Sequence, residues 1–160
     1  MRKLYAIQSV WLLLGTVFAW FTVTSDFNRF YSVYGNITRI SDCIIPNPVT
    51  TPCFYGAFAF LAAFVWSRYI YLTTKTKKIA NQNKLHILLI GSTIFAFTNL
   101  FIEIYNFYFI KSSGLISCSG VPAKSVFVTP CFIGSMFFLG AFIISTIIRK
   151  RNSSFSNNHR

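Results

Sequence analysis

Four cysteines carry the most distinctive chemistry of this 160-residue chain: Cys43, Cys53, Cys118 and Cys131. Paired thiols can form disulfide bonds, exchange electrons with a partner dithiol, or bind a soft metal ion. These cysteines are neither adjacent nor spaced as C-x-x-C, and no cysteine–histidine cluster has the spacing of a zinc site. The sequence therefore predicts disulfide chemistry and no metal site.

Two acidic residues, Asp26 and Glu103, lie at the ends of apolar segments. Carboxylates at membrane depth are costly to bury and are therefore candidates for a proton or ion site. Glu103 follows Leu85 by 18 residues, which in a helix is roughly 27 Å and brings it near a membrane surface. There Glu103 could pair with Lys111, and Asp26 with Arg29, at little cost. We favour these interfacial ion pairs over the proton or ion site.

The composition indicates a membrane protein. Hydrophobic residues make up 54% and aromatic residues 19% of the chain, while charged residues make up 11%, against about 25% in a typical soluble domain. The net charge of +12 would suit a nucleic-acid-binding protein, but a mean hydropathy of +0.54 does not. The composition excludes a disordered chain, argues against nucleic acid as a partner, and disfavours a water-soluble enzyme.

Four apolar stretches are long enough to cross a membrane as helices, which takes roughly 20 residues. They span residues 4–24, 51–72, 85–110 and 129–148. We therefore predict an all-α fold, a bundle of four transmembrane helices in the lipid bilayer. Residues 75–84 are predicted to form a basic loop, and residues 151–160 a disordered tail.

The basic residues predict the orientation of these spans. Eleven of the fifteen lysines and arginines fall on the side that holds both termini and the 75–84 loop. Because positive charge accumulates on the cytoplasmic side of membrane proteins, we expect both termini in the cytoplasm. The loops at about 25–50 and 111–128 are then extracytoplasmic.

The second and fourth spans begin with related sequences, TPCFYGAFAFLAAF at residues 51–64 and TPCFIGSMFFLGAF at residues 129–142, which are identical at nine of fourteen positions. A weaker match extends toward the N-terminus of each half and aligns Asp26 with Glu103. We therefore predict two repeated helical hairpins, residues 1–74 and 85–150, related by a pseudo-two-fold axis along the membrane normal. The matched prolines suit the first turn of a helix. Small residues could allow close helix approach, Gly56 with Ala59 or Ala63 and Gly134 with Gly140 or Ala141.

The four cysteines all fall on the predicted extracytoplasmic side, where an oxidising environment permits disulfide bonds. We favour one bond within each hairpin, Cys43–Cys53 and Cys118–Cys131, each typically contributing about 2–4 kcal/mol. Pairing across the repeat, Cys43–Cys118 and Cys53–Cys131, is also symmetric and stays open.

Four spans, cytoplasmic termini and two cysteines in each outer loop resemble the layout of the bacterial disulfide-bond formation protein B family. The likeness covers the whole chain but does not include that family's C-x-x-C pair, because nine residues separate Cys43 from Cys53. The resemblance implies a membrane thiol–disulfide oxidoreductase that passes electrons from a secreted dithiol partner to quinone, with the four cysteines as the catalytic residues.

The sequence leaves three functions open. We favour a structural, assembly or interaction protein with disulfide-bearing outer loops, no assigned catalysis and no cofactor, which would meet a membrane or secreted partner at those loops. Two cysteine pairs in near-identical TPCF-x-G settings would have similar reduction potentials, which weakens a directional relay. The oxidoreductase is the alternative, and a small transporter using Asp26 and Glu103 is third.

Overall fold

The computed structural model describes residues 2–36, 38, 46–109 and 125–157; the side chains of residues 75, 76 and 153–157 are not described. Four long helices make up most of this part of the chain: α1 (Arg2–Tyr34), α2 (Pro52–Leu72), α3 (Lys75–Phe109) and α4 (Pro130–Asn157). Two short 3-10 turns, η1 (Pro48–Thr50) and η2 (Val126–Val128), precede α2 and α4. All four helices are long and apolar enough to cross a membrane. The prediction of an all-α, four-helix integral membrane protein is confirmed.

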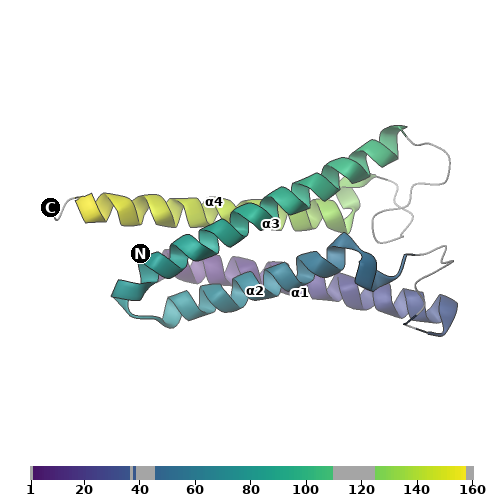
Figure 1. Ribbon diagram of the computed structural model, residues 1–160, viewed down its shortest axis with the longest axis horizontal. Coiled ribbons are helices and arrows are strands. Elements are labelled where there is room, and N and C mark those ends of the chain that lie inside the picture. Colours follow the sequence, from purple (N-terminus) through teal and green to yellow (C-terminus); the bar gives the residue numbers. More distant parts are fainter. Residues whose placement is uncertain (1, 37, 39–45, 110–124, 158–160) are drawn as a thin grey trace.

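The helices lie roughly along one long axis (Figure 1). Both ends of the chain lie at one end of the bundle, together with the short connection between α2 and α3. We call this the basic end, because α3 begins there with Lys75, Lys77 and Lys78 and α4 runs there through residues 149–151 (Arg-Lys-Arg). The opposite end, where α2 and α4 begin with Pro-Cys, is the cysteine end.

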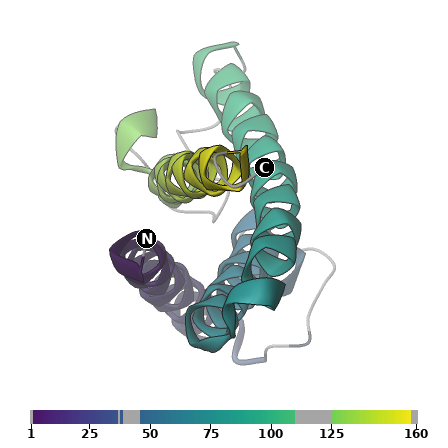
Figure 2. The same ribbon diagram turned by 90° about the vertical axis from the view of Figure 1, so that its left-hand side faces the viewer.

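Each helix packs against two neighbours in the cyclic order α1, α2, α3, α4. Figure 2 shows this arrangement from the basic end. Within the described residues, α1 and α3 make no close backbone contact, whereas α2 and α4 approach each other across the bundle. In Figure 1, α3 crosses the other helices obliquely and departs from α1 and α2 toward the cysteine end.

The buried core contains the same positions from the two halves of the sequence. Leu12 and Leu89 are both fully buried, and Ile70 and Ile148 are at most 1% exposed. At the centre, the rings of Phe60 and Phe138 stack with their centroids 3.7 Å apart and their planes 13° from parallel. Residues matched in the sequence thus meet in the interior.

Two glycines permit close packing: Gly140, which the sequence indicated, and Gly15, which it did not. A Cβ on Gly15 would lie 2.7 Å from the ring of Phe60, and one on Gly140 would lie 2.6 Å from the indole of Trp11. By contrast, a Cβ on Gly56 or Gly134 would meet nothing within 4 Å. The prediction of close helix approach is therefore confirmed at Gly140 and wrong at Gly56 and Gly134, whose Cα atoms face open space.

The helices extend beyond the predicted spans. α3 begins at Lys75, so the segment 75–84, predicted as a loop, is helical, and only Thr73 and Thr74 separate α2 from α3. α4 continues to Asn157 through most of the segment predicted to be disordered. Neither segment contains glycine or proline, so nothing interrupts the backbone hydrogen bonds that the hydrophobic spans start. Charged residues mark where a helix leaves the membrane, but they do not end the helix.

Candidate functional site

Each half of the chain begins its second helix with the same Thr-Pro-Cys sequence. Pro52 and Pro130 are the first residues of α2 and α4, where a missing N–H removes no helical hydrogen bond. Before them, the Thr51 hydroxyl donates to the carbonyl of Pro48 (2.7 Å), and the Thr129 hydroxyl lies 2.8 Å from the carbonyl of Val126. The preceding 3-10 turns are thereby tied to the helix starts.

This geometry brings Cys53 and Cys131 together. Their Sγ atoms lie 3.8 Å apart, and both side chains are half-buried. The sulfur atoms are therefore in contact, although α2 and α4 lie diagonally across the bundle. A disulfide bond would require them to approach to about 2.05 Å. Cys43 and Cys118 lie outside the described residues, so the predicted pairs Cys43–Cys53 and Cys118–Cys131 stay predictions.

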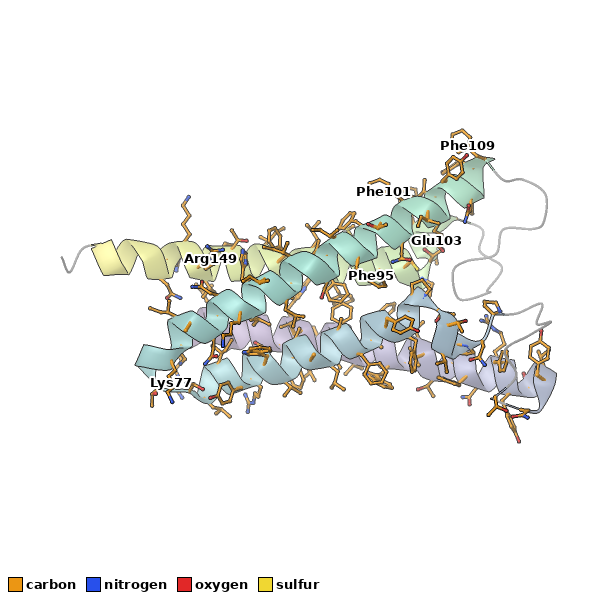
Figure 3. All side chains as sticks on the ribbon, viewed as in Figure 1. Lys77, Phe95, Phe101, Glu103, Phe109 and Arg149 are labelled. Carbon is orange, nitrogen blue, oxygen red and sulfur yellow. The ribbon has the colours of Figure 1, made fainter. Side chains whose placement is uncertain are left out.

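The two acidic residues lie within electrostatic reach of Cys53. Asp26 on α1 and Glu103 on α3 are 6% and 7% exposed, and both interact electrostatically with Cys53. Figure 3 shows Glu103 toward the cysteine end of α3, opposite Lys77 and Arg149 at the basic end. The matched acids are therefore part of the same site as the cysteines.

Each acid has a different polar partner. Asp26 Oδ1 accepts from the Arg29 guanidinium at 3.2 Å, which is the ion pair that the sequence suggested. Asp26 Oδ2 is buried and accepts no hydrogen bond from the described residues. Glu103 Oε2 lies 3.1 Å from the hydroxyl of Thr129, two residues before Cys131. Lys111, the predicted partner of Glu103, lies outside the described residues.

A small apolar cavity lies beside the two sulfur atoms. Its volume is about 50 Å³, and all four helices contribute to its wall. Most of its lining consists of matched residues from the two halves: Pro52 and Pro130, Cys53 and Cys131, Gly56 and Gly134, Phe60 and Phe138 from α2 and α4, together with Phe18 and Phe95, Ala19 and Ala96, Thr22 and Asn99 from α1 and α3. The absence of side chains at the two glycines leaves this space open.

The quinone implied by the family resemblance does not fit this cavity. Pockets that hold ligands of such size usually enclose about 300–1,000 Å³, and Asn99 and Thr22 are among the few polar groups in the lining. We therefore assign no step to quinone here. Within the described residues, no group of three or more histidine, cysteine, aspartate or glutamate side chains could hold a metal ion.

A second polar cluster, near the basic end, was missed in the sequence. Gln82 Nε2 on α3 donates to Gln8 Oε1 on α1 and to Ser145 Oγ on α4, both at 3.1 Å. His86 Nδ1 lies 3.1 Å from the same Ser145 hydroxyl. Gln8, Gln82 and Ser145 are completely buried. Polar residues within or beside apolar spans were the available signal, but the sequence does not show that they face one another.

Comparison of the chain with protein-family models, with curated proteins and with solved structures gives no match.

Proposed function

We propose that this chain is a membrane thiol–disulfide exchange protein in which Cys53 and Cys131 form the contact between its two halves. The single observation that supports the proposal is the 3.8 Å separation of their Sγ atoms. Thiol–disulfide exchange requires a thiolate to reach a disulfide sulfur directly. Two cysteines that served only to close separate loops would have no need to meet.

The exchange conserves atoms and electrons. A secreted dithiol partner is oxidised to a disulfide while one disulfide of the chain is reduced to two thiols. Within the chain, a thiolate at Cys53 or Cys131 attacks a disulfide containing the other cysteine. A Cys53–Cys131 bond forms, and the displaced sulfur leaves as a thiolate. A second thiolate then breaks that bond, so that two electrons have moved between the halves.

The neighbouring acids bear on this chemistry through their protonation, because an ionised carboxylate disfavours a thiolate at Cys53 whereas a protonated one does not. The exchange releases no net protons, because the two protons of the oxidised dithiol end on the two new thiols. A carboxylate beside the sulfur atoms can carry each proton from the attacking thiol to the displaced thiolate. Asp26 Oδ2 accepts no hydrogen bond from the described residues and Asp26 interacts with Cys53. We assign Asp26 and Glu103 to proton transfer at this site, in place of the transport role that the sequence left open.

The acids also make the two halves unequal, which a directional exchange needs. The matched TPCF-x-G sequences would by themselves give similar reduction potentials. However, Arg29 pairs with Asp26, whereas the position that matches Arg29 in the second half is the uncharged Asn106. The residues that follow the two matched acids therefore differ, and a difference in stabilisation of about 1.4 kcal/mol corresponds to 30 mV for a two-electron couple.

A cross-half disulfide that forms only during exchange would be the signature of this function. The oxidised chain, in membranes, is mixed with a reduced C-x-x-C protein, quenched with acid at intervals, alkylated and digested for mass spectrometry. We expect a peptide pair joined through Cys53 and Cys131 to rise and fall as the partner is oxidised. A matched control carries Cys131→Ser with Phe132→Cys, which keeps the number of thiols but moves the second sulfur off the contact.

The alternative is a structural or assembly protein whose disulfides never exchange, as the repeated TPCF-x-G settings favour. It predicts four fully oxidised cysteines that form neither a mixed disulfide nor a transient cross-half peptide. A Cys53–Cys131 bond that is already present before reduction and persists throughout would equally refute exchange, because it would be a static cross-link.

A further inference from the structure

Two arginine side chains meet at one aromatic ring at the basic end. The guanidinium carbon of Arg2, at the start of α1, lies 5.7 Å from the ring centroid of Tyr71. That of Arg68, one turn earlier than Tyr71 on α2, lies 5.4 Å from the same centroid. Both distances are within the range of cation–π attraction. The ring therefore gathers two positive charges at the boundary between α1 and α2.

These charges lack an acidic counterpart in the surrounding sequence. The three acidic residues of the chain are Asp26, Asp42 and Glu103, and none belongs to residues 2–24 or 52–90, which carry both arginines and their sequence neighbours. Two guanidinium groups that share one ring repel each other where no anion is present. An anion between them would remove the repulsion, and a phosphate is the anion whose geometry best matches a guanidinium fork.

An apolar groove begins at Arg68 and Tyr71, the ring that Arg2 also contacts. It lies between α1 and α2, has a volume of about 370 Å³, and is lined by Ala6, Ser9, Val10, Leu13 and Phe64 together with Arg68 and Tyr71. Val10 and Leu13 are 57% and 41% exposed. From Ala6 to Leu13 a helix rises roughly 10 Å, so the apolar lining runs about a third of the way through a 30 Å hydrocarbon core.

We propose that this groove binds one anionic phospholipid, with its phosphate on Arg2 and Arg68 and an acyl chain along Val10, Leu13 and Phe64. The charge of the arginines selects the headgroup, and the apolar lining of the groove selects a lipid over a soluble phosphate. This site does not depend on the proposed exchange function, because it lies at the opposite end of the bundle from Cys53 and Cys131.

The second half of the chain does not repeat the site. The positions that match Arg68 and Tyr71 are Thr146 and Arg149, so the aromatic ring that gathers the charges is missing there. The structure thus assigns one such lipid to each chain. It also supplies a matched control, since Arg149 is a basic residue of the same end that does not line the groove.

Native mass spectrometry would test this proposal. The chain is reconstituted in mixed vesicles of phosphatidylglycerol and phosphatidylcholine with identical acyl chains, extracted mildly and sprayed. We expect one phosphatidylglycerol to remain bound in preference to phosphatidylcholine. Retention should fall about fivefold in Arg68→Gln and again in Arg2→Gln, since each basic residue contributes about 1 kcal/mol to anionic-lipid attraction. Arg149→Gln should retain the lipid as the wild type does.

Two further measurements separate this lipid site from its alternatives. Val10→Trp should fill the groove and reduce retention while both arginines stay in place, whereas inorganic phosphate should not displace the lipid. Equal retention of the two lipids, the same loss in Arg149→Gln as in Arg68→Gln, or displacement by inorganic phosphate would each overturn the proposal. Because Arg2 and Arg68 are exposed, neither substitution removes a buried contact on which folding depends.

Discussion

At the scale of single residues, close packing in the middle of the bundle depends on two glycines that lie against aromatic rings, Gly15 against Phe60 and Gly140 against Trp11. The ring of Phe60 cannot move away from a new side chain, because Phe60 is 2% exposed and is stacked on Phe138. Trp11 is equally fixed, since its Nε1 donates to the carbonyl of Phe137 at 2.9 Å. Glycine is required at Gly15 and Gly140 for these contacts, and not because of its backbone freedom.

Substituting these glycines should therefore have opposite effects in two matched pairs. Gly15→Ala and Gly140→Ala place a Cβ within 2.7 Å of a fixed ring, so each should lower the free energy of unfolding by about 1–3 kcal/mol. Gly56→Ala and Gly134→Ala place it in open space and should raise that free energy by up to about 1 kcal/mol through helix propensity. Unfolding in detergent with increasing dodecyl sulfate measures both. Equal losses in all four variants would contradict the packing described.

At the scale of helices, buried polar side chains link three of the four elements near the basic end. Hydrogen bonds between transmembrane helices need no water to be displaced and fix which faces meet. Gln82 connects α3 to both α1 and α4, and Asn152 Nδ2 on α4 donates to the Tyr5 hydroxyl on α1 at 2.9 Å. The basic end is thus held by specific polar contacts, while the middle of the bundle is held by rings and small residues.

Removing one amide of this network should be worse than removing both. Gln82→Leu loses two interhelical hydrogen bonds and leaves Gln8 buried without its donor, so the free energy of unfolding should fall by about 1–2 kcal/mol. Gln8→Leu combined with Gln82→Leu should recover part of that loss, because no amide is then left unsatisfied between the two positions. The same detergent unfolding assay reports the difference.

Thr146→Val provides a control for this network. Thr146 is exposed, and its hydroxyl bonds only within its own helix, to the carbonyl of Phe142 at 2.9 Å. Thr146→Val should change the free energy of unfolding by less than about 0.5 kcal/mol, as substitutions at most surface positions do. A double variant as unstable as the sum of its single variants would show that Gln8 and Gln82 do not interact.

At the scale of the whole molecule, the two ends of the bundle differ in chemistry. Glu103 lies toward the cysteine end of the bundle, while Lys77 on α3 and Arg149 on α4 lie toward the basic end (Figure 3). The acids and the contacting cysteines therefore share the cysteine end, and the clustered lysines and arginines share the basic end. Because membrane proteins carry an excess of lysine and arginine on their cytoplasmic side, this separation favours one orientation.

We expect the basic end to face the cytoplasm. A green fluorescent protein fused to either terminus should fluoresce, and alkaline phosphatase inserted after Val49 should be active, because each reporter works on one side only. Replacing Lys75, Lys77, Lys78 and Lys84 with glutamine should reduce both signals by weakening the charge bias. Activity of phosphatase at the termini would reverse the orientation and place Cys53 and Cys131 on the reducing side, where a disulfide function would be untenable.

The sequence by itself determined that the chain forms four membrane-crossing helices and where α2 and α4 begin. These features depend only on the length of apolar runs and on prolines such as Pro52, and both act through local backbone geometry. The sequence did not predict that α3 begins as early as Lys75 or that α4 continues to Asn157, because charged residues are compatible with a continuing helix. It also named Cys53, Cys131, Asp26 and Glu103 as candidates without showing that they meet.

Only the tertiary structure decided which side chains contact one another. The 3.8 Å approach of Cys53 to Cys131, the cavity beside them and the groove next to Arg68 depend on how each helix is rotated about its axis and how it crosses its neighbours. Apolar spans are hydrophobic around most of their circumference, since lipid and protein faces attract similar residues. Hydropathy therefore fixes that these helices lie in the membrane, and close packing at positions such as Gly15 and Gly140 fixes how they are turned.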